Sequence, residues 1–299
     1  MNYVGFNPEK ERQDQSPDDW VFGSTSTPCL ALIPEEIRDT YLPIGEVQAG
    51  KQDTAGCASN APVNIYEDKF NYLYSNDKLQ NKKWLEDNGY VQDGRITFSD
   101  AFIAILSGTT RVGNSLKAPI DTIHSYGLVP KKLLPLEPWM MWDDYNDPNR
   151  ITQELKDLGQ EFLKRFTLNY ERVDTADLAT LLKTDMAVIA LSAYPVPVNG
   201  EYPRTEEPFN HAVVALRRPL TTIFDSYIDQ VDGDFIKKLA SDYRIFDTAY
   251  RVYISAEITE EDRAIQLTVF DSLMKYGLLA FFASWWESFS TRVRGIFYA

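Results

Sequence analysis

The sequence predicts an α+β fold in which a helical half precedes a strand-rich half. Residues 57–140 carry apolar side chains at helical spacing, and Phe98–Leu106 and Pro119–Tyr126 are the clearest helices among them. Beyond residue 185 the pattern changes to short apolar or β-branched runs that are bounded by Pro and Asn. Because the two patterns are segregated along the chain, they indicate segregated helical and sheet layers rather than repeated βα units.

Composition supports a folded chain and excludes one class of partner. The 299 residues are 44% hydrophobic, which is enough to bury a core and excludes a disordered chain. The 30 Lys and Arg against 44 Asp and Glu give a net charge of -14. Binding to nucleic acid through its phosphates requires a basic surface, so we expect no nucleic-acid partner.

Four segments follow one another along the chain. They are an irregular segment at 1–45, a helical subdomain at 46–140, a strand-rich subdomain at 141–256 and an amphipathic helix at 257–299. Ser99 and Asp100 are good N-caps for one helix, and Gly127 is a typical helix end. Further helices are predicted at 34–41, 153–166 and 175–182, and strands at 186–193, 211–216, 221–224 and 250–255.

The last segment, Thr259–Tyr298, has a broad aromatic face and begins with a run of acidic residues. Such a face either docks on its own domain or forms a surface for a partner protein, for self-association or for a membrane interface. These alternatives stay open from the sequence.

The cysteines and the termini bear on location and cofactors. The chain has only Cys29 and Cys57, which we expect to be free thiols in a reducing compartment. No signal-peptide pattern and no run of 18 apolar residues is present, so we expect a cytoplasmic protein without a transmembrane helix. We expect no cofactor and no metal, because paired zinc-ligand spacings and a complete phosphate-binding loop are both missing.

Three residues in a particular order carry the chemistry. Cys57 follows Gly56 at the start of the helical half, His211 opens an apolar strand, and Asp225 follows the next strand. A helix N-terminus and an imidazolium both favour the thiolate, which is the nucleophilic form of cysteine. A carboxylate on the other ring nitrogen orients the imidazole. The order therefore predicts a thiol nucleophile with its base, and Gln52 is a nearby donor for an oxyanion.

This arrangement resembles the papain-like cysteine peptidases. In that family a Gln precedes the nucleophile, the base lies in an Asn-His-Ala-Val strand, and an Asn-Ser-Trp motif follows. Residues 210–213 read Asn-His-Ala-Val, and residues 225–227 read Asp-Ser-Tyr where Asn-Ser-Trp is expected. The resemblance covers about residues 46–256 in order.

The resemblance implies a papain-like fold, in which a helical subdomain precedes a barrel-like, strand-rich subdomain and the active cleft lies between them. It also implies a role for each candidate residue. Cys57 would be the nucleophile, His211 the base, Asp225 its orienting partner and Gln52 the oxyanion donor.

The chain departs from the family pattern at several positions. Gln52 stands five residues before the nucleophile, where the family has six, and Ala58 replaces a Trp. Pro62 falls early in the nucleophile helix, so we expect that helix to kink or to start late. Tyr227 would take over the shielding by the motif's Trp. The Asp-Thr-x-x-Cys pattern at 53–57, without disulfide cysteines, resembles divergent papain-like proteins of tailed bacteriophages.

Three functions follow from the resemblance. The first is a cysteine peptidase with a polypeptide substrate. The second is a cell-wall peptide amidase with the same triad. The third is a weak or inactive papain-fold component of a virion-like assembly, which would make the location virion-associated. The sequence does not determine whether residues 1–45 cover the cleft.

Overall fold

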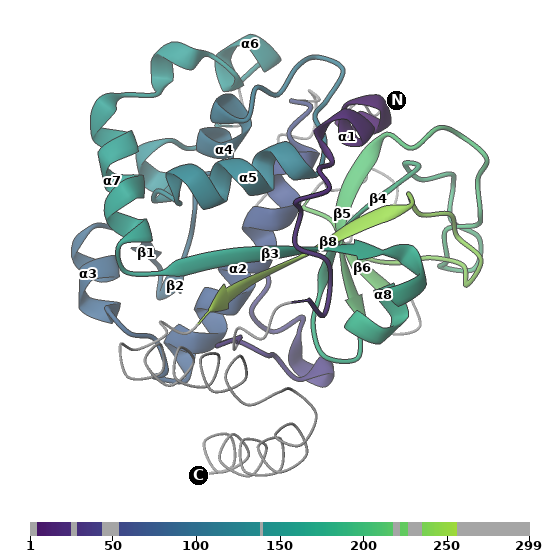
Figure 1. Cartoon of the computed structure of the whole chain (residues 1–299), viewed down its shortest axis with the longest axis horizontal. Helices are drawn as coiled ribbons and strands as arrows, with labels where there is room; N and C mark the ends of the chain where they lie inside the picture. Colours follow the sequence, from purple (N-terminus) through teal and green to yellow (C-terminus); the bar gives the residue numbers. More distant parts are fainter. Residues whose placement is uncertain are drawn as a thin grey trace, which may run out of the picture. The chain divides into compact units, whose positions relative to one another are not determined.

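The computed structural model describes residues 5–24, 29–43, 54–137, 140–217, 222–226 and 235–255 (Figure 1). All of them belong to one compact unit, Met1–Ala256. Gln52, Tyr227 and the predicted helix at 259–298 lie outside the described residues. The bounds of the four predicted segments stay a prediction.

The α-helices of the described residues lie before or directly after β3 (Thr167–Asp174), which is the first strand of the large sheet along the chain. They are α1 (Pro8–Asp14), α2 (Cys57–Ser75), α3 (Lys82–Asp87), α4 (Asp100–Leu106), α5 (Lys117–Tyr126), α6 (Trp142–Tyr145), α7 (Gln153–Leu163) and α8 (Thr175–Leu181). Two of the three predicted caps, Ser99 and Gly127, are confirmed, whereas Asp100 is the first residue of α4 and not its N-cap. The Ser99 hydroxyl accepts from the Phe102 N–H at 3.1 Å, and Gly127 ends α5 with φ +76°.

The strand-rich part is one six-stranded antiparallel sheet, in the order β3-β8-β4-β5-β6-β7. Its strands are β3 (Thr167–Asp174), β4 (Ala187–Leu191), β5 (His211–Arg217), β6 (Thr222–Phe224), β7 (Ile236–Lys238) and β8 (Thr248–Ser255). A separate hairpin joins β1 (Val91–Gln92) to β2 (Arg95–Ile96). The predicted α+β class is therefore confirmed.

Both faces of the sheet are buried, which explains why β4 is apolar at every position and β5 is apolar throughout its middle. In β5, Ala212 and Val214 belong to the larger core that contains α2. Val213 and Ala215 belong to a second core with the apolar residues of α8. In Figure 1, α2 runs through the middle of the unit, with α4 and α7 to its upper left, α5 above it and strands β4, β5 and β6 to its right.

Helix α2 is buried on nearly all sides, and several of its polar side chains have internal partners. The Glu67 carboxylate accepts from the Phe98 N–H at 2.5 Å, and Asn71 exchanges two hydrogen bonds with the backbone of Ile96. The Lys69 ammonium pairs with Asp185 at 2.5 Å. These contacts join the helix to neighbours on both sides, so its N-terminal residue is held firmly in place.

The structure corrects three expectations. Helix α2 begins at Cys57 and continues through Pro62, so a late helix start is wrong. The packing of a fully enclosed helix outweighs the roughly 3 kcal/mol that an interior Pro costs. The helix predicted at 34–41 is only a 3-10 turn, Glu35–Ile37. The segment 1–45 is not wholly irregular, because it contains α1, whose N-cap Asn7 accepts from two backbone N–H groups.

Among the described residues, sequence reasoning missed four strands, the two-residue strands β1 and β2 together with β3 and β7. Strand β3 contains Glu171 and Arg172, whose charges hide its alternation, and β7 has only three residues. None of the described helices has the length and apolarity that crossing a membrane requires.

Candidate active site

Cys57 is the first residue of α2, directly after the N-cap Gly56. The Ser59 and Asn60 N–H groups both donate to the Gly56 carbonyl, which closes the first turn. The preceding residue, Ala55, has φ +55°, a conformation that L residues rarely adopt. The sulfur of Cys57 therefore stands at the positive end of a 19-residue helix, where a thiolate is stabilised.

A polar cluster that the sequence did not reveal holds this turn. Tyr145 of α6 donates to Asp100 at 2.6 Å, and a Cβ at Gly56 would lie 2.9 Å from the Tyr145 hydroxyl oxygen. The Asn60 amide donates to the Gly56 carbonyl at 2.9 Å. Glycine at 56 thus permits the close approach of Tyr145. Tyr145 ends α6, a short helix that is not among the predicted elements, and its sequence carries no signal for this contact.

Strand pairing brings His211 and Asp225 together. His211 begins β5, Asp225 directly follows β6, and these strands are antiparallel, so the start of one lies beside the end of the other. The His211 Nε2 lies 2.9 Å from the Asp225 Oδ2. Both side chains are about as buried as the core, with 3% of each residue exposed. The carboxylate is therefore placed to orient the imidazole.

The third predicted residue, Cys57, also interacts with this ring. The Ala212 N–H donates to the Cys57 Sγ at 3.3 Å, and the His211 ring is hydrogen-bonded to Cys57. Because Asp225 engages Nε2, Nδ1 is the nitrogen that remains for the sulfur. Burial alone would lower the pKa of His211, but Asp225 and Cys57 raise it to about 10. The imidazolium is therefore the favoured form at neutral pH.

Two further side chains contact the Asp225 carboxylate. The Tyr194 hydroxyl donates to Oδ2 at 2.9 Å, and the buried Lys237 ammonium lies 3.8 Å from the same oxygen. The Tyr194 ring also packs edge-on against His211, with centroids 5.8 Å apart. Tyr194 thus shields the His211–Asp225 pair, which was the role expected of Tyr227. Neither Tyr194 nor Lys237 lies in a motif, so sequence reasoning missed both.

The N-terminal segment covers the sulfur. The N–H groups of Gly5 and Phe6 both donate to the Asn210 carbonyl, at 3.1 and 3.0 Å. A side chain at Gly5 would collide with the Cys57 Sγ. Only 5% of Cys57 is exposed as a result. The fourth candidate, Gln52, lies outside the described residues, so its place relative to the sulfur stays a prediction.

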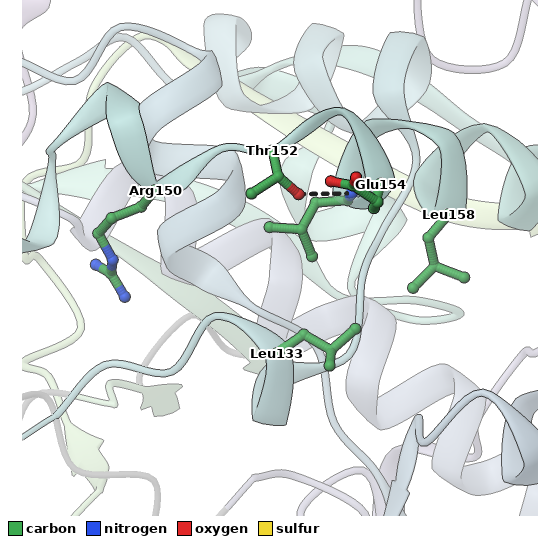
Figure 2. Close-up of a pocket in the computed structure, with 6 residues that line it drawn as sticks. Leu133, Arg150, Thr152, Glu154 and Leu158 are labelled. Carbon is green, nitrogen blue, oxygen red and sulfur yellow. Dashed lines mark hydrogen bonds between the residues drawn. The ribbon is translucent and has the colours of Figure 1, made fainter.

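Other candidate features lie apart from this site. A pocket between α7 and the 3-10 helix Lys131–Leu133 contains none of the three predicted residues (Figure 2). Its lining consists of Leu133, Arg150, Thr152, Glu154, Leu155 and Leu158. Burial raises the pKa of the Cys29 thiol, which makes it a poor nucleophile. Among the described residues, no group of three or more His, Cys, Asp or Glu side chains is arranged to hold a metal ion.

Comparison with solved structures identifies the architecture. Xylellain, a cysteine protease from Xylella fastidiosa, aligns over 85% of this chain and 96% of its own, with 16% identity and a TM-score of 0.53. The chain has the papain-like fold. ProCathepsin B S9 from Trypanosoma congolense aligns over 78% of the papain-like chain and 80% of its own, with 12% identity and a TM-score of 0.50.

Sequence comparison adds nothing to this assignment. No family model matches the papain-like chain, and no curated protein matches it. At these identities the two solved structures establish the fold alone. The chemistry of the site therefore depends on the side chains that this chain itself provides.

Proposed function

We propose that the chain is a cysteine peptidase that hydrolyses peptide bonds through Cys57, His211 and Asp225. One observation carries the proposal. A cysteine at the N-terminus of a buried helix and a buried carboxylate are both hydrogen-bonded to one imidazole ring. This is the arrangement that thiol-based acyl transfer requires, since the imidazole both stabilises the thiolate and delivers a proton.

The proposed reaction has two halves. The Cys57 thiolate attacks the peptide carbonyl carbon, and the oxygen becomes an oxyanion held by the Cys57 N–H and Gln52. The His211 imidazolium then gives its proton to the leaving amine, the C–N bond breaks, and a thioester remains. Neutral His211 next takes a proton from water, which attacks the thioester. The acid product leaves, and the thiolate and imidazolium are restored.

The buried His211–Asp225 pair favours the peptidase over the inactive assembly component. A component kept only for its shape has no need of a buried Asp–His pair beside a cysteine, because burying such charges costs free energy unless each is paired. Here Asp225 has three partners on one oxygen, His211, Tyr194 and Lys237. A bacteriophage or virion setting stays an expectation from the sequence alone.

The test is hydrolysis of a denatured, fluorescently labelled protein by the full-length chain. Because the sulfur is covered, wild type and a Gly5→Leu variant are assayed in parallel. We expect Cys57→Ala and His211→Ala to lose about 10³-fold or more of the rate, since nucleophile and base act as one unit. Cys29→Ala is the matched control and should keep the parent rate.

Each outcome decides between the candidate functions. Cleavage of the denatured protein that depends on both residues supports the peptidase. Clearing of purified murein without cleavage of the denatured protein would identify the amidase instead. Absence of both activities from wild type and from Gly5→Leu would leave the inactive component as the function.

A further inference from the structure

We infer that a buried chain of three side chains fixes the direction of the Cys57 N–H, the backbone donor that would hold an oxyanion. The three positioning residues are Asp100, Tyr145 and Asn60, and their hydrogen bonds end on the Gly56 carbonyl. Such a role rests on the proposed function, because only a reaction at a carbonyl group places a developing charge on its oxygen.

The peptide group between Gly56 and Cys57 links this chain to the reaction. A trans peptide group is planar, so its carbonyl and its N–H point in opposite directions. Cys57 is the first residue of α2, and an N–H at that position has no partner within the helix and points out of its N-terminus. Whatever holds the Gly56 carbonyl therefore also sets the direction of the Cys57 N–H.

Asn60 holds that carbonyl through two groups. Its side-chain amide donates to the Gly56 oxygen at 2.9 Å, and its backbone N–H donates to the same oxygen at 3.0 Å. The backbone bond belongs to the first turn of the helix, as any helical residue could form it. The side-chain bond is specific to Asn60, and the residue is buried.

Tyr145 and Asp100 fix the orientation of the Asn60 amide. The Tyr145 hydroxyl donates to the Asp100 carboxylate at 2.6 Å and is also hydrogen-bonded to the Asn60 side chain. A phenol has a single proton, so the Tyr145 oxygen accepts from Asn60. The amide NH₂ has two hydrogens, one for Tyr145 and one for the Gly56 carbonyl. Only one orientation of the amide satisfies both contacts.

The surrounding structure keeps the chain in place. Tyr145 and Asp100 are both buried. Arg150 donates to the Tyr145 carbonyl at 3.1 Å and to the Pro135 carbonyl at 2.8 Å, which ties α6 to the loop before it. A Cβ at Gly56 would lie 2.9 Å from the Tyr145 hydroxyl oxygen, so glycine at 56 permits this approach. An enclosed network of this kind is rigid, which is what a precisely aimed donor requires.

The first experiment compares two reactions of the Cys57 thiolate in the full-length protein. With an aldehyde, the S–C bond forms, the carbonyl electron pair moves onto the oxygen, and that oxygen takes the proton of the His211 imidazolium. With iodoacetamide, the S–C bond forms and iodide leaves, and no charge develops on a carbonyl oxygen. Aldehyde affinity therefore depends on the Cys57 N–H, whereas the labelling rate depends on the thiolate and its exposure.

The probes are acetylated dipeptide aldehydes with apolar, acidic or basic side chains. Their dissociation constants are measured as protection of Cys57 from iodoacetamide, in wild type and in Gly5→Leu. Asn60→Leu and Tyr145→Phe should each weaken the best aldehyde about tenfold, since small misplacements of a reacting group are costly. The labelling rate without aldehyde should change less than about twofold. Tyr66→Phe, which removes another buried hydroxyl of α2, is the matched control and should change neither quantity.

Three results would overturn the inference. The first is an unchanged aldehyde affinity in both variants, and the second is a parallel loss of affinity and labelling, which a purely structural role would give. The third is no aldehyde binding by either wild type or Gly5→Leu. In addition, the double variant Asn60→Leu/Tyr145→Phe should lose no more than the larger single loss, because the two residues act in series. Losses that multiply would contradict a single chain.

Hydrolysis of the labelled protein distinguishes failure of this inference from failure of the proposed function. In an active enzyme, Asn60→Leu and Tyr145→Phe should lower kcat about 10–100-fold and change KM less than about threefold. An unchanged kcat keeps the peptidase and overturns the positioning role. Weaker aldehyde binding by the variants of a chain that hydrolyses nothing keeps the positioning role and overturns the peptidase.

Discussion

Replacing Asp225 by Asn should lower the pKa of His211 while leaving the geometry of the site intact. The Asn oxygen still accepts from the ring Nε2–H, 2.9 Å away in the wild type, but the negative charge is gone. Because burial lowers the pKa of His211 and the charge of Asp225 raises it, the pKa should fall from about 10 towards about 7. A paired opposite charge typically shifts a pKa by about 1–3 units, or about 1.4–4 kcal/mol.

The same change has a signed effect on stability. A raised pKa means that the imidazolium stabilises the folded wild type fully below about pH 6.5, and that this contribution is lost as pH rises through about 10. The Asp225→Asn variant lacks most of this stabilisation of the folded state. The difference between wild type and Asp225→Asn in free energy of unfolding should therefore be largest near about pH 6 and should shrink towards about pH 10.

The chain has only two histidines, so NMR titration of the ring signals measures this directly. A His124→Gln variant assigns the signal of His211. The wild-type signal should keep its imidazolium position up to about pH 9, and the Asp225→Asn signal should change below about pH 8. Urea unfolding at two pH values checks the stability difference. A wild-type His211 that titrates near 6.5, or an unchanged titration in Asp225→Asn, would refute the electrostatic argument.

Two further predictions concern stability and use urea unfolding. Asp185→Asn leaves the buried Lys69 ammonium without its 2.5 Å carboxylate and should lower the free energy of unfolding by about 3–5 kcal/mol. Asp143→Asn breaks an exposed ion pair and should lower the free energy of unfolding by under about 1 kcal/mol. Equal losses for Asp185→Asn and Asp143→Asn would contradict the prediction. Gly127→Ala should lower the free energy of unfolding by at least about 2 kcal/mol, for two reasons. Residue 127 has φ +76°, which a residue with a side chain disfavours, and its Cβ would collide with the Gly159 carbonyl of α7. Gly200→Ala has a similar φ and open space, so a loss as large there would show that strain alone accounts for the effect.

The elements that were predicted correctly from the sequence are those that a local pattern defines. Ser99 caps a helix and Gly127 ends one because each acts within a few residues of itself. The apolar run after residue 185 predicted β4 and its neighbours because both faces of the sheet are buried. Strand β3 escaped because its buried Glu171 pairs with Arg251 of β8, a contact that no local period encodes.

The sequence by itself determined which residues are the candidates for the chemistry and in what order, because Cys57, His211 and Asp225 each stand in a short motif beside a helix or strand end. Only the tertiary structure decided what surrounds them. Tyr145, beside the turn at Gly56, and Lys237, beside Asp225, belong to elements that are distant in the sequence. The backbone of Gly5 and Phe6, which covers the sulfur, comes from the N-terminal part of the chain. Such contacts depend on the shape of the packed core, which emerges from all of its side chains together and leaves no mark at any one position.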